Sequence, residues 1–134
     1  MSRQIFINLP VADLARSMAF FKALGFSHNP QFSDDNGACI IVSDTIFVML
    51  LTHARFRDFT PKAVCDTSQA VEVLLTLSCE SREQVDGLVA RALAAGGSTY
   101  DKPEDHGFMY THSFVDPDGH GWGLVHMSAM PAQE

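Results

Sequence analysis

The sequence predicts an α+β fold made of two copies of one unit, strand–helix–strand–strand–strand (βαβββ). Two observations predict it. The order of elements repeats at a spacing of about seventy residues, and equivalent residues flank the two helices, with Leu9 matching Leu77 and Gly25 matching Gly96. A duplicated unit of this kind predicts two curved sheets that face each other around a cup. The length of 134 residues suits a single domain, 1–134.

The first unit is expected over about residues 3–52. It opens with a strand of β-branched and aromatic residues that ends at Pro10. Asp13 is the expected N-cap of the following helix, and Gly25 its left-handed end. The apolar face of that helix is predicted at Leu14, Met18, Phe21 and Leu24. Three strands are expected next, over residues 26–32, 38–42 and 45–51, with a turn at residues 34–37.

Residues 53–69 interrupt the pattern as a connecting loop with room for one helical turn. The loop is longer than a typical connection, so it is either a linker or a lid over a site.

The second unit is expected over about residues 70–127. A strand over 71–79 precedes a capping box, in which Ser81 is the N-cap and Gln84 follows three residues later. The apolar stripe of the second helix is predicted at Val85, Leu88, Val89, Ala92 and Leu93, and the pair Gly96-Gly97 ends the helix. Strands are expected near 98–100 and over 108–115 and 121–127, with a hairpin turn at 116–119 and a frayed tail at 130–134.

Composition and charge exclude several classes of function. Hydrophobic residues make up 46% of the chain and charged residues 19%, which excludes intrinsic disorder. The net charge of −7, with nine scattered Lys and Arg residues, argues against binding nucleic acid or an anionic membrane surface. No apolar stretch approaches the ~20 residues that span a bilayer.

Cysteine usage favours a cytoplasmic protein. There are three cysteines, no CxxC pair, and no apolar run of a signal peptide at the start. Cys39 and Cys79 lie in apolar strand-like runs, so we expect small buried hydrophobic residues rather than nucleophiles.

Two stretches of the chain carry a family resemblance. Residues 11–17, Val-Ala-Asp-Leu-Ala-Arg-Ser, lead into a helix that ends Leu24-Gly25-Phe26. Residues 114–120, Phe-Val-Asp-Pro-Asp-Gly-His, form the last predicted hairpin. They resemble the V-x-D-L-x-x-S and L-G-F stretches and the F-x-D-P-D-G-[HN] hairpin of the vicinal oxygen chelate superfamily. This group includes glyoxalase I, the bleomycin-resistance proteins and the extradiol dioxygenases.

The resemblance covers nearly the whole chain in the right order and spacing. It implies paired βαβββ units around a shared site, and frequent homodimers. Superfamily activities include glutathione-thiohemiacetal isomerisation, extradiol ring cleavage, fosfomycin opening, epimerisation and drug sequestration, so the fold does not select a function.

Most enzymes that this chain resembles hold one divalent metal through His, Glu or Gln side chains from four strands. Carried over residue by residue, those positions are Phe6, Met49, Leu74 and Gly123. None is a plausible ligand for a hard or borderline cation, and Glu72 is the one normal ligand close by in sequence. We therefore expect no metal and no other cofactor.

Apolar residues at those positions predict one of two arrangements. Either they line a hydrophobic pocket for an aromatic or hydrophobic ligand, or their side chains fill the cup as part of the core. His112 or Tyr110 is the expected polar contact to a ligand, whereas His120 is expected to have a structural role in the hairpin and His126 to face away from the cavity. The candidate ligand-binding residues are Phe6, Asn8, Met49, Leu74, Thr76, Tyr110, His112 and Trp122.

Three hypotheses follow. The first is a glyoxalase-like or bleomycin-resistance-like protein that binds a small molecule without catalysis. The second is an enzyme of the superfamily, a lyase, isomerase or dioxygenase, using a metal or an acid–base pair such as Glu72 with His112. The third is a regulatory or interaction module in which a dimer face matters more than the cup.

Overall fold

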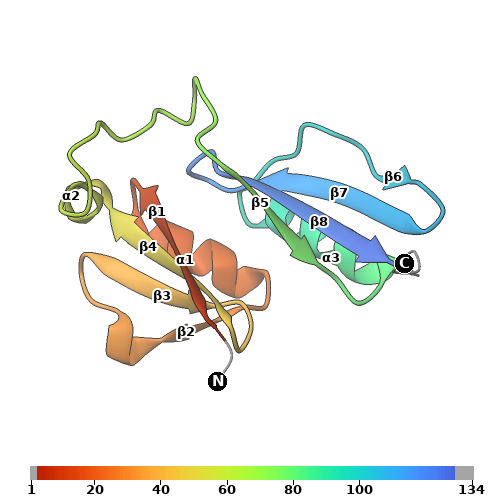
Figure 1. The fold of residues 1–134 in the computed structure, drawn as a ribbon, viewed down its shortest axis with the longest axis horizontal. Helices are drawn as coiled ribbons and strands as arrows, with labels where there is room; N and C mark the ends of the chain where they lie inside the picture. The colour runs from red at the N-terminus through yellow and green to blue at the C-terminus, as the bar shows by residue number, and fades with distance from the viewer. Residues whose placement is uncertain (1–2, 129–134) are drawn as a thin grey trace. The chain divides into compact units, whose positions relative to one another are not determined.

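The computed structural model describes residues 3–128 and divides the chain into two compact units, Met1–Asp66 and Thr67–Glu134 (Figure 1). Each contains a four-stranded mixed sheet with a helix against one face. The tail predicted at 130–134 lies outside the described residues.

The first unit contains the strands β1 (Ile5–Val11), β2 (Ser27–Asn29), β3 (Gly37–Ile41) and β4 (Ile46–Thr52). The helix α1 (Leu14–Ala23) follows β1, a 3-10 turn η1 (Pro30–Phe32) follows β2, and the short helix α2 (His53–Arg57) follows β4. The strand order is β1-β4-β3-β2; β1 is parallel to β4, and the other pairs are antiparallel.

The second unit repeats this order with β5 (Leu74–Ser78), α3 (Arg82–Ala94), β6 (Glu104–Asp105), β7 (Met109–Val115) and β8 (Gly121–Met127). Its strand order, β5-β8-β7-β6, is that of the first sheet, with β5 parallel to β8. The predicted α+β fold of two βαβββ units is therefore confirmed. Among residues 3–128, no helix has the length and apolar character needed to cross a membrane.

The predicted capping residues begin both long helices. The carboxylate of Asp13 accepts a hydrogen bond from the N–H of Arg16 at 3.1 Å, which satisfies a donor that has no partner within the helix. Ser81 Oγ accepts from the N–H of Gln84 at 3.0 Å, and the Gln84 side chain accepts in return from the N–H of Glu80 at 2.7 Å. Gly25 and Gly96 follow the two helices with φ angles of +102° and +103°, a region that favours glycine.

The helix faces that are buried differ slightly from those predicted. In α1 the buried residues are Ser17, Phe20 and Phe21, whereas Leu14 and Met18 are half-buried. Phe21 and Leu24 are buried as predicted, and Ser17 and Phe20 join them in place of Leu14 and Met18. In α3, Val85, Leu88, Val89 and Ala92 are buried as predicted, but Leu93 lies beside that stripe and is exposed.

Several strand boundaries were predicted wrongly. Pro10 does not end β1, which continues to Val11; an edge strand tolerates proline because it forms a ladder on one side only. The strand expected at 26–32 stops at Asn29, where Pro30 starts a 3-10 turn. The strand expected at 71–79 is shortened to β5.

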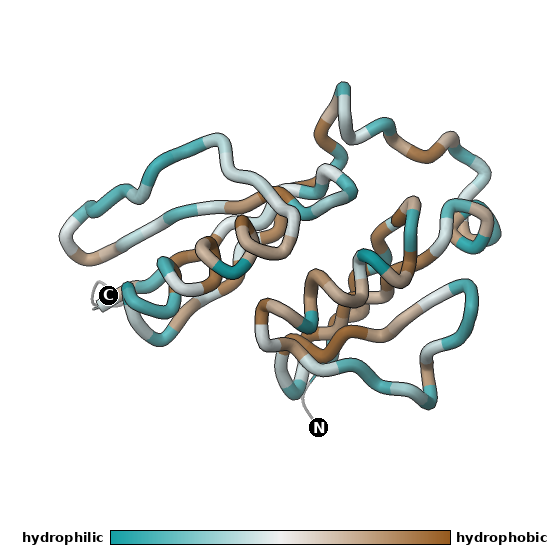
Figure 2. The backbone as a smooth tube through the Cα atoms, turned by 180° about the vertical axis from the view of Figure 1, so that it is seen from behind, coloured by the Kyte–Doolittle hydropathy of each residue, from teal (hydrophilic) through white to brown (hydrophobic). Residues whose placement is uncertain are grey.

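The strand expected near 98–100 is reduced to one bridge between Ser98 and Val115. The edge strand β6 forms instead at Glu104–Asp105, where it meets β7 opposite Tyr110 and Thr111. The chain that leads into β6 is mostly hydrophilic (Figure 2), so it has no apolar face to bury on the sheet.

Candidate functional site

A pocket of about 450 Å³ lies in the first unit, on the face of the sheet opposite α1. It is lined by Gln4, Phe6, Asn29, Phe32, Cys39, Phe47 and Met49. Two of these, Phe6 and Met49, are residues that the sequence analysis proposed for a ligand site.

The strand register explains why these side chains share one face. Phe6 is the partner of Phe47, and Cys39 is the partner of both Met49 on β4 and Asn29 on β2. Side chains alternate between the two faces of a sheet, so the residues between them point to the other side. Those intervening residues are buried against α1, and include Leu9, Ile40, Val48 and Leu50.

Aromatic rings dominate the pocket. Phe6 and Phe47 stack with their ring centroids 4.9 Å apart and their planes 12° from parallel. Phe6 is 54% exposed and Phe32 is 65% exposed, although both are large apolar side chains. Rings held open to solvent in this way offer a surface on which another flat, apolar group can stack.

The polar groups of the pocket are few and uncharged. Asn29 and Gln4 contribute side-chain amides, and Cys39 contributes a thiol that is almost fully buried. Burial raises the pKa of the Cys39 thiol, which keeps it protonated at neutral pH and makes it a poor nucleophile. The expectation that Cys39 and Cys79 are buried is confirmed.

Asn8 lies on the same face as Met49, its partner in the register, but does not line the pocket. In the second unit, Leu74 and Thr76 share the sheet face on which Gly121 and Gly123 lie. A Cβ on Gly123 would approach Thr76 Oγ1 to 2.8 Å, so the hydroxyl occupies the space that a side chain would need. Leu74 is 63% exposed.

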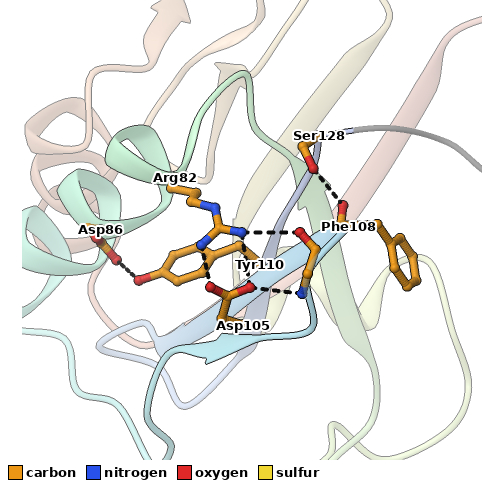
Figure 3. A network of polar contacts seen from close by, with 7 residues as sticks. Arg82, Asp86, Asp105, Phe108, Tyr110 and Ser128 are labelled. Atoms are coloured by element: carbon orange, nitrogen blue, oxygen red, sulfur yellow. Dashed lines mark hydrogen bonds and ion pairs between the residues drawn. The ribbon is translucent and has the colours of Figure 1, made fainter.

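The other three predicted site residues lie on the opposite face of the second sheet, toward α3. Tyr110 Oη donates to the Asp86 carboxylate on α3 at 2.7 Å, and the Arg82 guanidinium lies over the Tyr110 ring, 5.1 Å from its centroid (Figure 3). His112 lies 3.3 Å from the carbonyl oxygen of Asp101. The strand register puts both side chains on the α3 side, away from Leu74 and Thr76.

Trp122 is a core residue of the same α3 side and is 1% exposed. Its ring stacks on Phe114 at 6.1 Å, and its indole N–H donates to Asp116. Trp122 therefore does not share the sheet face of Leu74 and Thr76, because adjacent strand residues such as Trp122 and Gly123 point to opposite faces.

The acid–base pair suggested for an enzyme, Glu72 with His112, is not formed. Glu72 Oε1 instead lies 2.6 Å from Nδ1 of His120, which is buried in the β7–β8 hairpin. The backbone N–H of His120 also donates to the Asp116 carboxylate at 3.0 Å, consistent with its predicted structural role. His126 lies on the α3 side with Nδ1 3.0 Å from the carbonyl oxygen of Cys79, as its predicted orientation requires.

The residues at the superfamily's metal-ligand positions do not fit a divalent metal. Phe6 and Met49 both line the pocket, and neither has an oxygen or imidazole donor. Across residues 3–128 there is also no group of three or more His, Cys, Asp or Glu side chains that could hold an ion.

Several pocket residues were missed by the sequence analysis. Phe47 could have been found, because it lies two residues before Met49 on the same strand and so shares its face. Gln4 lies just before β1, two residues from Phe6. Phe32 could not have been found, because η1 sets its position where the sequence predicted a strand. Asn29 is the last residue of β2 and shares the face of its register partner Cys39, so finding it required the pairing of β2 with β3.

Comparison with known proteins was consistent with this architecture. Residues 3–43 match the family described as bleomycin resistance protein-like N-terminal. A glyoxalase/bleomycin resistance protein/dioxygenase family enzyme from Burkholderia phytofirmans PsJN superposes with a TM-score of 0.77 at 17% identity, over 94% of this chain and 99% of that one. The chain therefore resembles this family over residues 3–43 and has the glyoxalase/bleomycin-resistance fold. The family match includes the first of the two end motifs, and the second motif lies outside it.

Other solved structures share this fold. A hypothetical protein from S. aureus is 30% identical, with a TM-score of 0.78 over 94% of this chain and 95% of that one. An antibiotic binding protein from Streptomyces sp. CB03234 is 20% identical, with a TM-score of 0.68 over 96% and 98% of the two chains. No curated protein matches this chain.

Proposed function

We propose that this protein is a bleomycin-resistance-like binding protein whose first unit holds a small aromatic or hydrophobic ligand without metal-dependent catalysis. The observation that carries the proposal is the open pocket around the stacked rings of Phe6 and Phe47. Phe6 and Met49 stand where metal-binding relatives carry ligand side chains, so the pocket offers stacking surface in place of a Lewis acid.

The antibiotic binding protein from Streptomyces supports the proposal by analogy, since it has the same fold. The size of the pocket also fits a small molecule, because ligand pockets generally measure about 300–1,000 Å³. Apolar walls with a few polar groups that orient the ligand are typical of small-molecule sites.

A ligand screen tests the proposal. Aromatic compounds and antibiotics should raise the melting temperature, since a ligand that binds the folded state stabilises it. Amide signals of the pocket residues should shift in heteronuclear NMR spectra. Phe6→Ala should weaken binding about tenfold, the equivalent of losing one aromatic contact of about 1.5 kcal/mol.

Phe108→Ala is the matched control, because Phe108 is also exposed but belongs to the second unit (Figure 3). It should leave the affinity unchanged. A broad panel without a single hit, or equal effects of the two substitutions, would count against the proposal. The enzyme alternative is tested by assaying lactoylglutathione formation from methylglyoxal and glutathione, with added nickel, zinc, manganese or iron(II). Turnover would favour the enzyme hypothesis over the binding hypothesis.

A further inference from the structure

The turn η1 distinguishes the pocket-bearing unit from its repeat. It lies between β2 and β3 and supplies Phe32 to the pocket, with Asn29 as its N-cap. The equivalent connection in the second unit, between β6 and β7, contains no 3-10 turn in the part of the chain described. An element added to one copy of a duplicated unit, at the rim of its pocket, is a candidate for setting ligand specificity.

The side-chain amide of Asn29 has a fixed orientation. Its Oδ1 accepts a hydrogen bond from the backbone N–H of Gln31 at 3.0 Å. A backbone N–H can only donate, so the oxygen must face Gln31, and the Nδ2 group takes the other direction. The capping bond therefore uses the acceptor of this amide and leaves its two N–H donors for another group.

The backbone at Asn29 is held as firmly as the side chain. Ser33 Oγ donates to the carbonyl oxygen of Asn29 at 2.7 Å and accepts from the backbone N–H of Cys39 at 3.1 Å. Asn29 is also the register partner of Cys39, which lines the same pocket. A donor held on both its side chain and its backbone loses little freedom when it binds a ligand.

The charge of the pocket limits what it can bind. The seven described residues that line it are all uncharged. An anionic ligand would lose its hydration among phenylalanine rings, whose faces carry partial negative charge, without gaining an opposite charge, which is unfavourable. A neutral ring stacked on Phe6 or Phe32 with an acceptor at its edge would meet both the rings and the amide donor.

We propose that Asn29 is a specificity-determining residue, and that its Nδ2 group selects neutral, planar aromatic ligands that carry a hydrogen-bond acceptor. This inference rests on the proposed binding function and adds the chemical class of the ligand.

Three probes of one shape test it: 2-acetylnaphthalene, which is neutral with a carbonyl acceptor; 2-ethylnaphthalene, which has no acceptor; and 2-naphthoate, which is an anion. Affinity for the full-length protein is measured by NMR titration of the pocket amides. The acetyl compound should bind about three- to tenfold more tightly than the ethyl compound, the equivalent of one hydrogen bond. The carboxylate should bind more weakly than both.

Asn29→Asp keeps the oxygen that caps η1 and removes the N–H donors, so the turn should be retained. It should abolish the advantage of the acetyl compound and leave the affinity of the ethyl compound within about twofold, since neutral stacking does not use the donor. Asn29→Ser, which keeps a capping oxygen and regains a hydroxyl donor, should restore part of the advantage. Gln31→Ala is the control, because Gln31 contributes only its backbone N–H to the cap.

The outcomes separate the two proposals. Equal binding of the acetyl and ethyl compounds, or an unchanged preference in Asn29→Asp, would overturn the role of Asn29 and leave aromatic binding intact. Failure of all three probes to bind would overturn both. Shifts of the pocket amides on dilution without any probe would show that a second copy covers the pocket, and would overturn both as well.

Discussion

The indole N–H of Trp122 donates to Oδ2 of Asp116 across 3.1 Å, and this bond joins the last strand to the turn that precedes it. Oδ1 of the same carboxylate accepts from the N–H groups of Asp118 and His120, at 2.9 and 3.0 Å. Asp116 therefore satisfies three donors while almost completely buried. Burial raises the pKa of its carboxyl group, and the hydrogen bonds to Trp122 and to the turn oppose that rise.

Asp116→Asn should destabilise the protein by about 1–3 kcal/mol, because one carboxylate oxygen becomes an NH₂ group and faces a donor. Urea denaturation measures the loss in the free energy of unfolding. Asp35→Asn, an exposed change in another turn, should have no measurable effect. Equal stability of the two variants would contradict the role given to Asp116.

The two glycines at φ +86° form a matched pair. A Cβ on Gly107 would meet nothing within 4 Å, whereas a Cβ on Gly119 would lie 2.7 Å from Thr67 Oγ1 and 3.1 Å from the Thr67 carbonyl oxygen. Gly107→Ala should reduce the free energy of unfolding by about 1–2 kcal/mol, because alanine is strained in the left-handed backbone conformation. Gly119→Ala should destabilise the protein more, because the added methyl group would clash with the Thr67 side chain. Thermal unfolding of both variants measures which one loses more stability. Equal losses, or a larger loss in Gly107→Ala, would mean that Thr67 moves aside freely.

The pairing of Arg82 with Asp105 should respond to acid. Arg82 donates to both carboxylate oxygens of Asp105, at 2.6 and 3.0 Å (Figure 3). These bonds hold the pKa of the Asp105 carboxyl group at about 2, below the ordinary 3.8. Because the folded pKa is lowered, the contribution of the pair is complete above about pH 4 and is lost as the pH falls through about 2. The Gly107 amide, which donates to Asp105 at 2.9 Å, reports this directly by NMR.

The chemical shift of the Gly107 amide should follow the titration of Asp105, with a midpoint near pH 2. In Arg82→Gln the midpoint should rise toward the ordinary value, because the opposite charge is gone. A midpoint already near 3.8 in the unmodified protein would mean that the pair does not persist in solution.

The reciprocal cap of α3 should behave as one unit. Ser81→Ala should reduce the free energy of unfolding by about 1 kcal/mol, since the N–H of Gln84 loses its acceptor. Gln84→Ala should cost less, because the N–H of Glu80 that it leaves is exposed to water. A double-mutant cycle by urea denaturation should show a double loss smaller than the sum of the single losses. Strict additivity would indicate that the two bonds form independently.

The sequence determined the fold because the fold depends on local patterns. Asp13, Ser81 and the glycines after each helix act through neighbours within a few residues, so their roles could be predicted from spacing. The two end motifs and the repeated order of elements then indicated the glyoxalase/bleomycin-resistance fold, which the structure confirms. The family resemblance also pointed to Phe6 and Met49 as site positions, and both line a pocket in the structure.

The tertiary structure alone decided which other side chains join them. Phe32 reaches the pocket from a 3-10 turn that periodicity does not predict, because the turn begins at Pro30 inside an expected strand. Asn29 reaches the pocket from β2, where its register partner is Cys39, and its side chain caps the turn. Tyr110, His112 and Trp122 lie toward α3 because strand pairing fixes the face of every residue, and a shift of one position reverses it. Secondary structure follows from neighbours in the chain, whereas the composition of a site follows from register between strands far apart in it.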